Sequence, residues 1–387
     1  MIKLQKDKWE IVRLEDLCQI NIGKTPSRNN LLNFGKGYTW LSISDFNGEK
    51  YLSNSKEEIT DFALKEANHK IIKENTVLLT FKLTIGKLAI TGKPLYTNEA
   101  IASLPIRDEN VIGTDFLFTV LQTVDYNSKI DKAVKGATLN KEKLKELPIP
   151  LPSLFEQKQI VSLFQSIETA IEQVEGQERN LKALQKSLAD GLLKPEPAFG
   201  NLLNKTNCTS TTFGEIAECD KKYPEHEKEV ERFVGLEWIE ADNFQLQGYG
   251  LVANGTTFTK RFAKGDVLFG KRRAYLNKVA IADFDGICSG DILVIRAKAK
   301  KMMQELLPFY ISADAFINHA VSTSAGSLSP RTKWKDLADF EVSIPDLETQ
   351  EQILNIFLQL QNTLKQLRQQ KTTLRNLKQK LLSEILG

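Results

Sequence analysis

The chain contains few of the residues from which metal centres and disulfide frameworks are built. Its 387 residues include three histidines and four cysteines. The cysteines, Cys18, Cys208, Cys219 and Cys288, form no CxxC pair, so neither a zinc site nor a disulfide framework is indicated. No stretch approaches the roughly 18 apolar residues of a membrane span, and no apolar run follows the charged start as an export signal requires. We therefore expect a soluble, cytoplasmic protein with reduced thiols and no membrane partner.

The motifs of common nucleotide-using and DNA-modifying enzymes are also missing. A methyltransferase acting on a base amino group needs an Asn-Pro or Asp-Pro pair in its catalytic motif, and the chain contains neither pair. Gly23-Lys24-Thr25 resembles the end of a phosphate-binding Walker A loop, but Cys18 stands where that loop requires its first glycine. We expect no bound nucleotide and no methyl transfer by this chain alone.

One cysteine stands where a nucleophile would. Cys288 is centred in a Gly-x-Cys-x-Gly sequence, which resembles the nucleophile elbow of a hydrolase. A strand-like sequence follows at 291–296 where the elbow requires a helix, and this favours a buried structural cysteine. Asp283, Asp285 and Asp291 nearby lack the spacing of a calcium-binding loop. The sequence therefore predicts no catalytic, cofactor-binding or metal-binding residue.

The composition is that of an ordinary globular protein with a small excess of positive charge. Hydrophobic residues make up 41% of the chain, and its length predicts two or three domains of about 150 residues each. The net charge is +3 and the isoelectric point about 8.4. This charge permits a nucleic-acid or acidic partner without requiring one.

A long helix with a heptad pattern occurs twice in the chain. Five apolar residues at seven-residue spacing recur 193 positions later, as Pro152 and Gln157 before them recur at Pro345 and Gln350. A period of half the chain predicts two tandem units, each a globular segment followed by one long helix. Neither helix is stable in water with its apolar seam exposed, so we expect the two to pair, in antiparallel orientation. The residues expected to pair the helices are Ile160, Ile167, Val174, Leu181 and Leu188 in the first and Ile353, Leu360, Leu367, Leu374 and Leu381 in the second.

The starts of both helices carry capping residues. Ser153 and Glu156 have the S-x-x-E spacing of a capping box. Asp346 can cap the second helix, although Thr349 replaces the glutamate there. A helix of about 40 residues would be roughly 60 Å long.

Polar residues interrupt each apolar seam. They are Glu178 and Gln185 in the first helix and Lys371 and Lys378 in the second. Opposite charges would favour pairing of one helix with the other, whereas the alternative is that these side chains face water.

The globular segments mix strands and helices. In the first, the runs 38–44, 76–81 and 87–91 predict strands and 115–124 predicts a helix. The second repeats this plan, with strands at 267–270 and 277–282 and a helix at 306–321. Such an irregular order predicts an α+β fold. The expected organisation is a first globular domain at 1–150, a long helix at 151–194, a Pro- and Gly-containing linker at 195–212, a second globular domain at 213–345 and a second long helix at 346–387.

Basic loops occur at matching places in both globular segments. Glycine lets a backbone approach a phosphate, hydroxyl and amide groups bond it, and arginine and asparagine can also read base edges. Each loop alone could be an ordinary solvated turn, but their matched positions indicate a duplicated recognition device for double-stranded DNA. The candidate DNA-binding residues are Lys24, Thr25, Ser27, Arg28, Lys82, Thr84, Lys87, Lys135, Thr138 and Asn140 in the first segment and Lys271, Arg272, Arg273, Tyr275, Ser327, Ser329, Arg331 and Lys333 in the second.

The chain resembles the specificity subunit of a type I restriction-modification system. The residues that carry the resemblance are the run 150–157 with Ile160, its second copy from Ile344 to Gln350 with Ile353, and the long helix after each. The runs 23–27 and 135–138 also resemble family segments. The resemblance covers nearly the whole chain in domain order, and Thr349 departs from it only at a helix cap.

This resemblance implies a non-catalytic protein in which two target recognition domains, separated by two antiparallel helices, each read half of a bipartite DNA site. It also implies that the helices dock two modification subunits, which bind S-adenosylmethionine, and that restriction subunits using ATP and Mg²⁺ join the full complex. The loops differ between the two segments, so the two half-sites should differ as well.

Three alternatives compete with this interpretation. The first is a similar specificity subunit of a type II restriction-modification enzyme. The second is a non-enzymatic coiled-coil interaction protein, which would bind DNA without sequence preference. The third is an enzyme that uses Cys288, which would lose its activity on Cys288→Ser.

Overall fold

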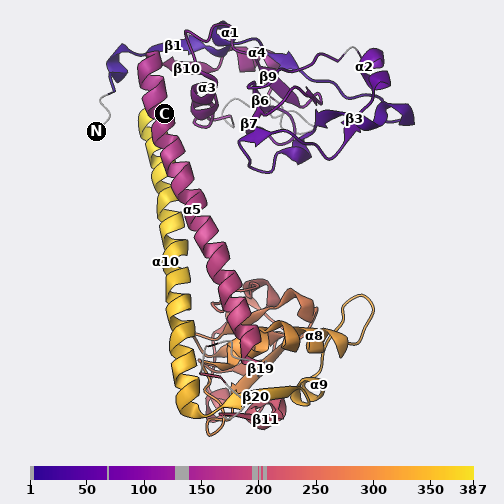
Figure 1. The fold of residues 1–387 in the computed structure, drawn as a ribbon, viewed down its shortest axis with the longest axis vertical. Coiled ribbons are helices and arrows are strands. Elements are labelled where there is room, and N and C mark those ends of the chain that lie inside the picture. The colour runs from indigo at the N-terminus through magenta and orange to yellow at the C-terminus, as the bar shows by residue number, and fades with distance from the viewer. Residues whose placement is uncertain (1–3, 68, 127–138, 194–198, 200–201, 204–206) are drawn as a thin grey trace. The chain divides into compact units, whose positions relative to one another are not determined.

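The computed structural model describes residues 4–67, 69–126, 139–193, 199, 202–203 and 207–387 (Figure 1). The chain forms two compact units. Unit 1 comprises Met1–Gln173 and Lys371–Gly387, and unit 2 comprises Val174–Gln370. Each long helix therefore contributes residues to both units.

Unit 1 is built around a five-stranded sheet with a smaller sheet of three strands. The central strands, β6 (Val77–Thr80) and β9 (Ile101–Leu104), are buried at every position, as continuous apolar runs predict. The five-stranded order is β2 (Asn21–Ile22), β9, β6, β7 (Leu88–Thr91) and β4 (Tyr51–Leu52), and the three-stranded order is β5 (Glu58–Ile59), β3 (Phe34–Leu41) and β8 (Tyr96–Thr97).

Short helices pack against the sheets of unit 1. Helix α3 (Thr114–Leu121) buries six consecutive residues from Phe116 to Leu121, and all of them except Thr119 belong to the main hydrophobic core of this unit. A separate two-stranded ladder, β1 (Glu10–Arg13) with β10 (Pro148–Leu151), joins the two ends of the globular segment. The other α-helices among the described residues of its globular part are α1 (Leu14–Leu17), α2 (Asp61–Ala67) and α4 (Lys141–Lys145).

Unit 2 has two four-stranded sheets and its own ladder, β11 (Cys208–Thr212) with β20 (Glu341–Pro345). The first sheet has the order β12 (Ala217–Cys219), β19 (Ile292–Ala297), β16 (Val267–Gly270) and β17 (Val279–Ile281). The second has the order β14 (Gly250–Leu251), β13 (Arg232–Val234), β18 (Gly286–Cys288) and β15 (Lys260–Phe262). The helices of its globular part are α6 (Phe213–Ile216), α7 (Leu307–Ser312), α8 (Asp314–Ser322) and α9 (Trp334–Ala338).

The prediction of one helix at 306–321 is wrong. The segment forms α7 and α8, with Ala313 between them in an extended conformation. The Asp314 N–H, which a continuous helix would bond to Tyr310, donates instead to the Asp190 carboxylate of the first long helix. The 38–44 strand also differs, since β3 ends at Leu41 and a 3₁₀ turn follows at Ile43–Asp45.

The two units repeat one plan, and the α+β prediction is confirmed. Strands β6, β7 and β9 of unit 1 have the same mutual pairing as β16, β17 and β19 of unit 2, and each unit closes with an antiparallel terminal ladder. The segment 195–212, predicted as a linker, ends in strand β11.

The long helices are α5 (Leu154–Leu192) and α10 (Leu347–Leu386). The predicted capping box is present: Glu156 N–H donates to Ser153 Oγ at 3.4 Å, and Ser153 N–H donates to Glu156 Oε2 at 3.2 Å. Asp346 Oδ1 accepts from Thr349 N–H at 2.8 Å, so the aspartate caps α10 alone. Among the described residues, none of the helices combines the length and the hydropathy that a bilayer-spanning segment needs.

In both units α5 and α10 pack together and run antiparallel. In unit 2, Glu178 pairs with Arg368 (Oε1 to Nε, 3.2 Å) and Gln185 with Gln361 (Oε1 to Nε2, 2.6 Å). Residue numbers thus increase along α5 while those of the contacted residues in α10 decrease, as antiparallel helices require. In unit 1 the beginning of α5 shares a core with Leu382 and Leu386 near the end of α10.

Three of the four polar seam residues join the helices, and two of these contacts pair opposite charges, as expected. Glu178 and Gln185 are buried and pair with Arg368 and Gln361. Lys378 pairs with Glu168 at 2.7 Å. Each of these polar seam residues thus pairs with a residue of the other helix that directly follows an apolar seam residue.

Candidate nucleic-acid interface

The loop between β16 and β17 carries three of the five basic residues predicted to bind DNA in unit 2. Arg273 and Asn277 have the left-handed backbone conformation, with φ of 53° and 45°. The 3₁₀ turn between them, Ala274–Leu276, buries Ala274 and leaves Tyr275 exposed. The loop is therefore a defined turn that presents Arg273 and Tyr275 to solvent.

A second loop, 324–333, lies beside the β16–β17 loop and is joined to it by backbone hydrogen bonds. Arg273 N–H donates to Pro330 O at 2.8 Å, and Thr332 N–H donates to Lys271 O at 3.1 Å. Arg331 and Ala325 exchange two backbone hydrogen bonds of 2.9 and 3.0 Å, which close this loop on itself. The structure thus brings together the two basic segments of unit 2 that lie more than 45 positions apart in the sequence.

Asp291 lies between the arginines of these loops. Its carboxylate accepts two bonds from Arg331, at 2.7 and 3.1 Å, and lies 3.6 Å from Arg272 Nη1. Arg272 also donates to Ser329 Oγ at 3.0 Å. The hydrogen bond from Arg331, opposed by partial burial, holds the pKa of Asp291 below its ordinary value, so the carboxylate stays charged and fixes both guanidinium groups.

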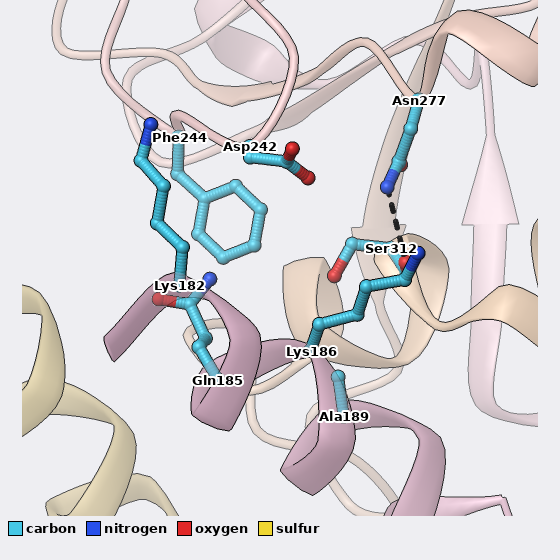
Figure 2. Close-up of a pocket in the computed structure, with 8 residues that line it drawn as sticks. All are labelled: Lys182, Gln185, Lys186, Ala189, Asp242, Phe244, Asn277 and Ser312. Carbon is cyan, nitrogen blue, oxygen red and sulfur yellow. Dashed lines mark hydrogen bonds between the residues drawn. The ribbon is translucent and has the colours of Figure 1, made fainter. Parts of the chain in front are cut away.

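The end of the β16–β17 loop is hydrogen-bonded to helix α7 of unit 2. Asn277 Nδ2 donates to Ser312 O at 3.2 Å, at the end of α7 (Figure 2). Beside this bond is a small cavity of about 20 Å³, room for one water molecule. Lys186 of α5 also pairs with Asp314 at 2.9 Å. The residues around the cavity are Lys182, Gln185, Lys186, Ala189, Asp242, Phe244, Asn277 and Ser312.

The corresponding loop of unit 1 joins β6 to β7. Leu83 is left-handed at φ 62° and 79% exposed, and Gly86 follows at φ 88°. Lys87 Nζ donates to Phe46 O at 3.2 Å, while Lys82 Nζ lies 5.4 Å from the Phe81 ring. Thr84 is exposed. This loop is less basic than its counterpart and has an apolar tip.

The 23–30 segment of unit 1 is held by acidic residues. Both Nη atoms of Arg28 donate to the carboxylate of Glu57, at 2.6 and 2.7 Å, and the guanidinium lies 4.3 Å from the Phe34 ring. Thr25 donates to Glu99. Lys24 and Ser27 are exposed. Arg28 is thus a positioned guanidinium with one stacking face covered.

The remaining predicted contacts differ in their surroundings. Asn140 caps α4 by accepting from Lys143 N–H at 2.9 Å. Ser327 and Lys333 are exposed on the second basic loop of unit 2. Lys135 and Thr138 lie outside the described residues.

The predicted helix-pairing residues all lie at least partly buried. Those counted as buried are Ile160, Ile167, Val174, Ile353 and Leu367. Those of intermediate exposure are Leu181, Leu188, Leu360, Leu374 and Leu381.

The acidic partners of the arginines were not predicted as part of the site. Nothing in the turn sequence around Asp291 marks it as the partner of an arginine 40 positions away. Glu57 gives no sequence signal either. Among the described residues, no cluster of His, Cys, Asp and Glu is arranged to hold a metal ion.

Cys288 lies on strand β18 and is fully buried. Burial raises the pKa of its thiol to about 12. A protonated, inaccessible thiol is a poor nucleophile, which argues against the alternative of an enzyme that uses this cysteine.

Comparison with known proteins gives a consistent result. Residues 6–183 and 207–376 match the family model described as "Type I restriction modification DNA specificity domain". The chain is 24% identical over 341 residues to the type I restriction enzyme MjaIX specificity subunit of Methanocaldococcus jannaschii, covering 85% of this chain and 75% of that protein. It is 23% identical over 395 residues to the EcoDI specificity subunit of Escherichia coli, covering 91% and 81%.

Two solved structures share the fold. The type I restriction-modification S subunit from M. genitalium aligns with a TM-score of 0.55 at 14% identity, covering 100% of this chain and 98% of that one. A chain from a study of complex assembly and conformational transition of the type I system aligns with a TM-score of 0.62 at 15% identity, covering 99% and 98%.

Proposed function

Because the chain belongs to the family of type I restriction-modification DNA specificity subunits, which are non-catalytic and carry no cofactor, we propose that it reads a bipartite site in double-stranded DNA, one half-site per globular domain. We assign residues 1–150 and 213–345 as the two target recognition domains. S-adenosylmethionine and ATP are bound by the modification and restriction subunits of such systems. A DNA substrate implies a cytoplasmic location.

The observation that carries this proposal is a repeated scaffold with unlike loops. Strands β6, β7 and β9 recur as β16, β17 and β19, yet the loop at 81–87 has an apolar tip and the loop at 271–278 is strongly basic. A recognition surface depends on its exposed side chains, whereas the scaffold only positions them. The two half-sites should therefore differ, and the whole site should be asymmetric.

The basic loops of unit 2 suit a DNA backbone as well as bases. Arg272 and Arg331 are fixed by Asp291, so fewer rotamers are lost when they bind phosphate. Lys271 and Lys333 add charge beside them. Such contacts supply much of the affinity and make it fall with salt.

We further propose that α5 and α10 set the separation of the half-sites and dock two modification subunits, through which restriction subunits join. Their shared apolar seam supports this role, because paired helices are stiffer than single ones. Exposed polar residues on the remaining helix faces leave those faces open to partners.

The test is methylome sequencing of cells that carry this chain with its cognate modification subunit. We expect one asymmetric motif made of two short half-sites and an unread spacer of constant length, methylated on adenine. Cells with the modification subunit alone are the control and should lack the motif. If both cultures show the same methylation, the proposed function is wrong.

A further inference from the structure

The β6–β7 loop of unit 1 and the β16–β17 loop of unit 2 have the same bonded roots. Phe81 N–H donates to Ala100 O at 3.0 Å, and Lys271 N–H donates to Asp291 O at 3.0 Å. Leu139 N–H donates to the Phe81 carbonyl at 3.0 Å, and Thr332 N–H donates to the Lys271 carbonyl at 3.1 Å. Phe81 and Lys271 thus occupy equivalent positions at the starts of the two loops.

The third residue of each loop has the same unusual backbone. Leu83 has φ of 62° and Arg273 has φ of 53°, both in the left-handed region. Large side chains are disfavoured there, and glycine is the residue that relieves the strain. Two large side chains at equivalent strained positions are not explained by folding, since strain of this kind is retained chiefly at functional sites.

Exposure makes Leu83 more unusual still. Its side chain is 79% exposed, so the residue contributes almost nothing to the core while it occupies a strained backbone. Lys82 and Lys87 flank it and give the loop a positive charge. Such a loop suits the major groove of DNA. The lysines can approach the phosphates, and the apolar tip can contact the methyl group of a thymine.

In unit 2, the three arginines of the β16–β17 loop and the 324–333 loop differ in how firmly their side chains are held. Arg331 is bound to Asp291 through two bonds, and Arg272 is bound to Ser329 and faces Asp291. Arg273 has a single 3.5 Å contact from Nη2 to Leu328 O, at the limit of a hydrogen bond. Of these three arginines, Arg273 is thus the one whose guanidinium can turn toward a ligand without breaking strong hydrogen bonds.

We propose that Leu83 and Arg273 are equivalent base-reading residues, one in each unit. Arg273 donates two hydrogen bonds to O6 and N7 of a guanine, and Leu83 packs against the C5 methyl of a thymine. This inference rests on the proposed function and adds to it the chemistry of one position in each half-site.

The test uses the full chain in complex with its modification subunit, and duplexes carrying the methylome motif with single changed bases. In the unit 2 half-site, replacing one guanine by 7-deazaguanine, which lacks the N7 acceptor, should weaken binding by the wild-type complex. Arg273→Ala should bind that duplex and the unmodified one equally. The wild type's preference for the guanine over other bases, expected at about 5- to 150-fold, should disappear.

The matching experiment on unit 1 replaces thymine by uracil, which removes only the methyl group. Wild type should lose affinity at one position of that half-site, and Leu83→Ala should be insensitive there. Lys82→Ala is the control, because loss of a phosphate contact should weaken all duplexes alike and lower the salt dependence.

Glycine variants separate recognition from folding. Leu83→Gly and Arg273→Gly relieve the left-handed strain, so the melting temperature should not fall, while selectivity at the two positions is lost. A lower melting temperature with unchanged selectivity would overturn the inference in favour of a structural role. A uniform loss of affinity across all duplexes would overturn it in favour of a phosphate contact.

The two proposals fail in different ways. If the wild-type complex prefers no bipartite site, the proposed function is wrong. If it does prefer one and both alanine variants keep the wild-type selectivity at every base, the inference alone is wrong.

Discussion

Gln157 and Gln350, 193 residues apart, make the same three hydrogen bonds in the two units. Gln157 Nε2 donates to Pro152 O and Val111 O, each at 2.9 Å, and its Oε1 accepts from Gly113 N–H at 3.0 Å. Gln350 Nε2 donates to two carbonyls at 2.9 Å, and its Oε1 accepts from Met303 N–H at 2.9 Å. Both side chains are buried. Each glutamine thus binds the first turn of a long helix to its globular domain.

Truncating either glutamine should therefore destabilise the protein. Gln157→Ala or Gln350→Ala leaves buried backbone groups without partners, at about 1–3 kcal/mol for each group. Urea unfolding followed by circular dichroism measures the loss as a lower midpoint. The controls are Gln165→Ala and Gln352→Ala, exposed residues on the same helices, which should stay within about 0.5 kcal/mol of wild type. Equal effects at buried and exposed positions would show that these bonds are not what holds the helix starts.

Local sequence signals predicted the long helices well. The capping box at Ser153 and the heptads predicted a first long helix at 151–194, and α5 spans Leu154–Leu192. Both signals depend on residues a few positions apart, so they can be read without knowing the fold. The strand at 267–270 was predicted for the same reason, since it is a short, fully buried apolar run.

Features set by distant contacts could not be predicted. The break at Ala313 depends on Asp190, which lies 124 positions before Asp314 and accepts the N–H that a continuous helix would have used. Arg28 was predicted only as a candidate DNA-binding residue, and nothing local indicated that Glu57, 29 positions away, accepts both of its Nη donors. The sequence thus predicted which loops carry the candidate residues. It could not predict their ion pairs, because these join residues that only the folded chain brings together.

A second pair of equivalent positions differs in chemistry. Glu168 pairs with Lys378 at 2.7 Å in unit 1, and their counterparts in the repeat, Gln361 and Gln185, pair at 2.6 Å in unit 2. Lys378→Glu should destabilise unit 1, by up to about 1 kcal/mol, because it puts two carboxylates together at a partly exposed site. Adding Glu168→Lys should restore the wild-type midpoint of urea unfolding.

An amide pair should also be tolerated at the unit 1 position. Glu168→Gln with Lys378→Gln copies the pair seen in unit 2 and should unfold within about 0.5 kcal/mol of wild type, with less dependence on salt. A large loss of stability in this double variant would contradict the equivalence of the two positions.

The buried thiols should resist alkylation in the folded protein. Burial raises the pKa of Cys18 and of Cys288 to about 12, so neither forms a thiolate near neutral pH. We expect mass spectrometry after iodoacetamide treatment at about pH 8 to find both cysteines unmodified until urea is added. Rapid labelling of Cys288 in the native protein would refute its structural assignment. Cys288→Ser should leave the methylated motif unchanged.

Because of Asp291, the free energy of unfolding of unit 2 should decrease at acidic pH. Its pKa is lower in the folded state than in the unfolded chain, chiefly because Arg331 donates to it. Its contribution is therefore present above the unfolded value of about 3.9 and is lost as the pH falls through the folded value. Asp291→Asn removes this contribution, so the urea midpoints of variant and wild type should differ at pH 6 and converge as the pH falls below about 4. A constant difference at all pH values would contradict the ionic role.

The same substitution should change DNA binding in one half-site only. Asp291→Asn releases Arg272 and Arg331 and removes a negative charge beside them, so affinity for unrelated DNA should rise while discrimination in the unit 2 half-site falls. Fluorescence anisotropy on duplexes altered in one half-site at a time measures both effects. Glu57→Gln is the matched variant in unit 1, where it frees Arg28, and it should affect the other half-site. If either substitution alters both half-sites equally, the assignment of one half-site to each unit is wrong.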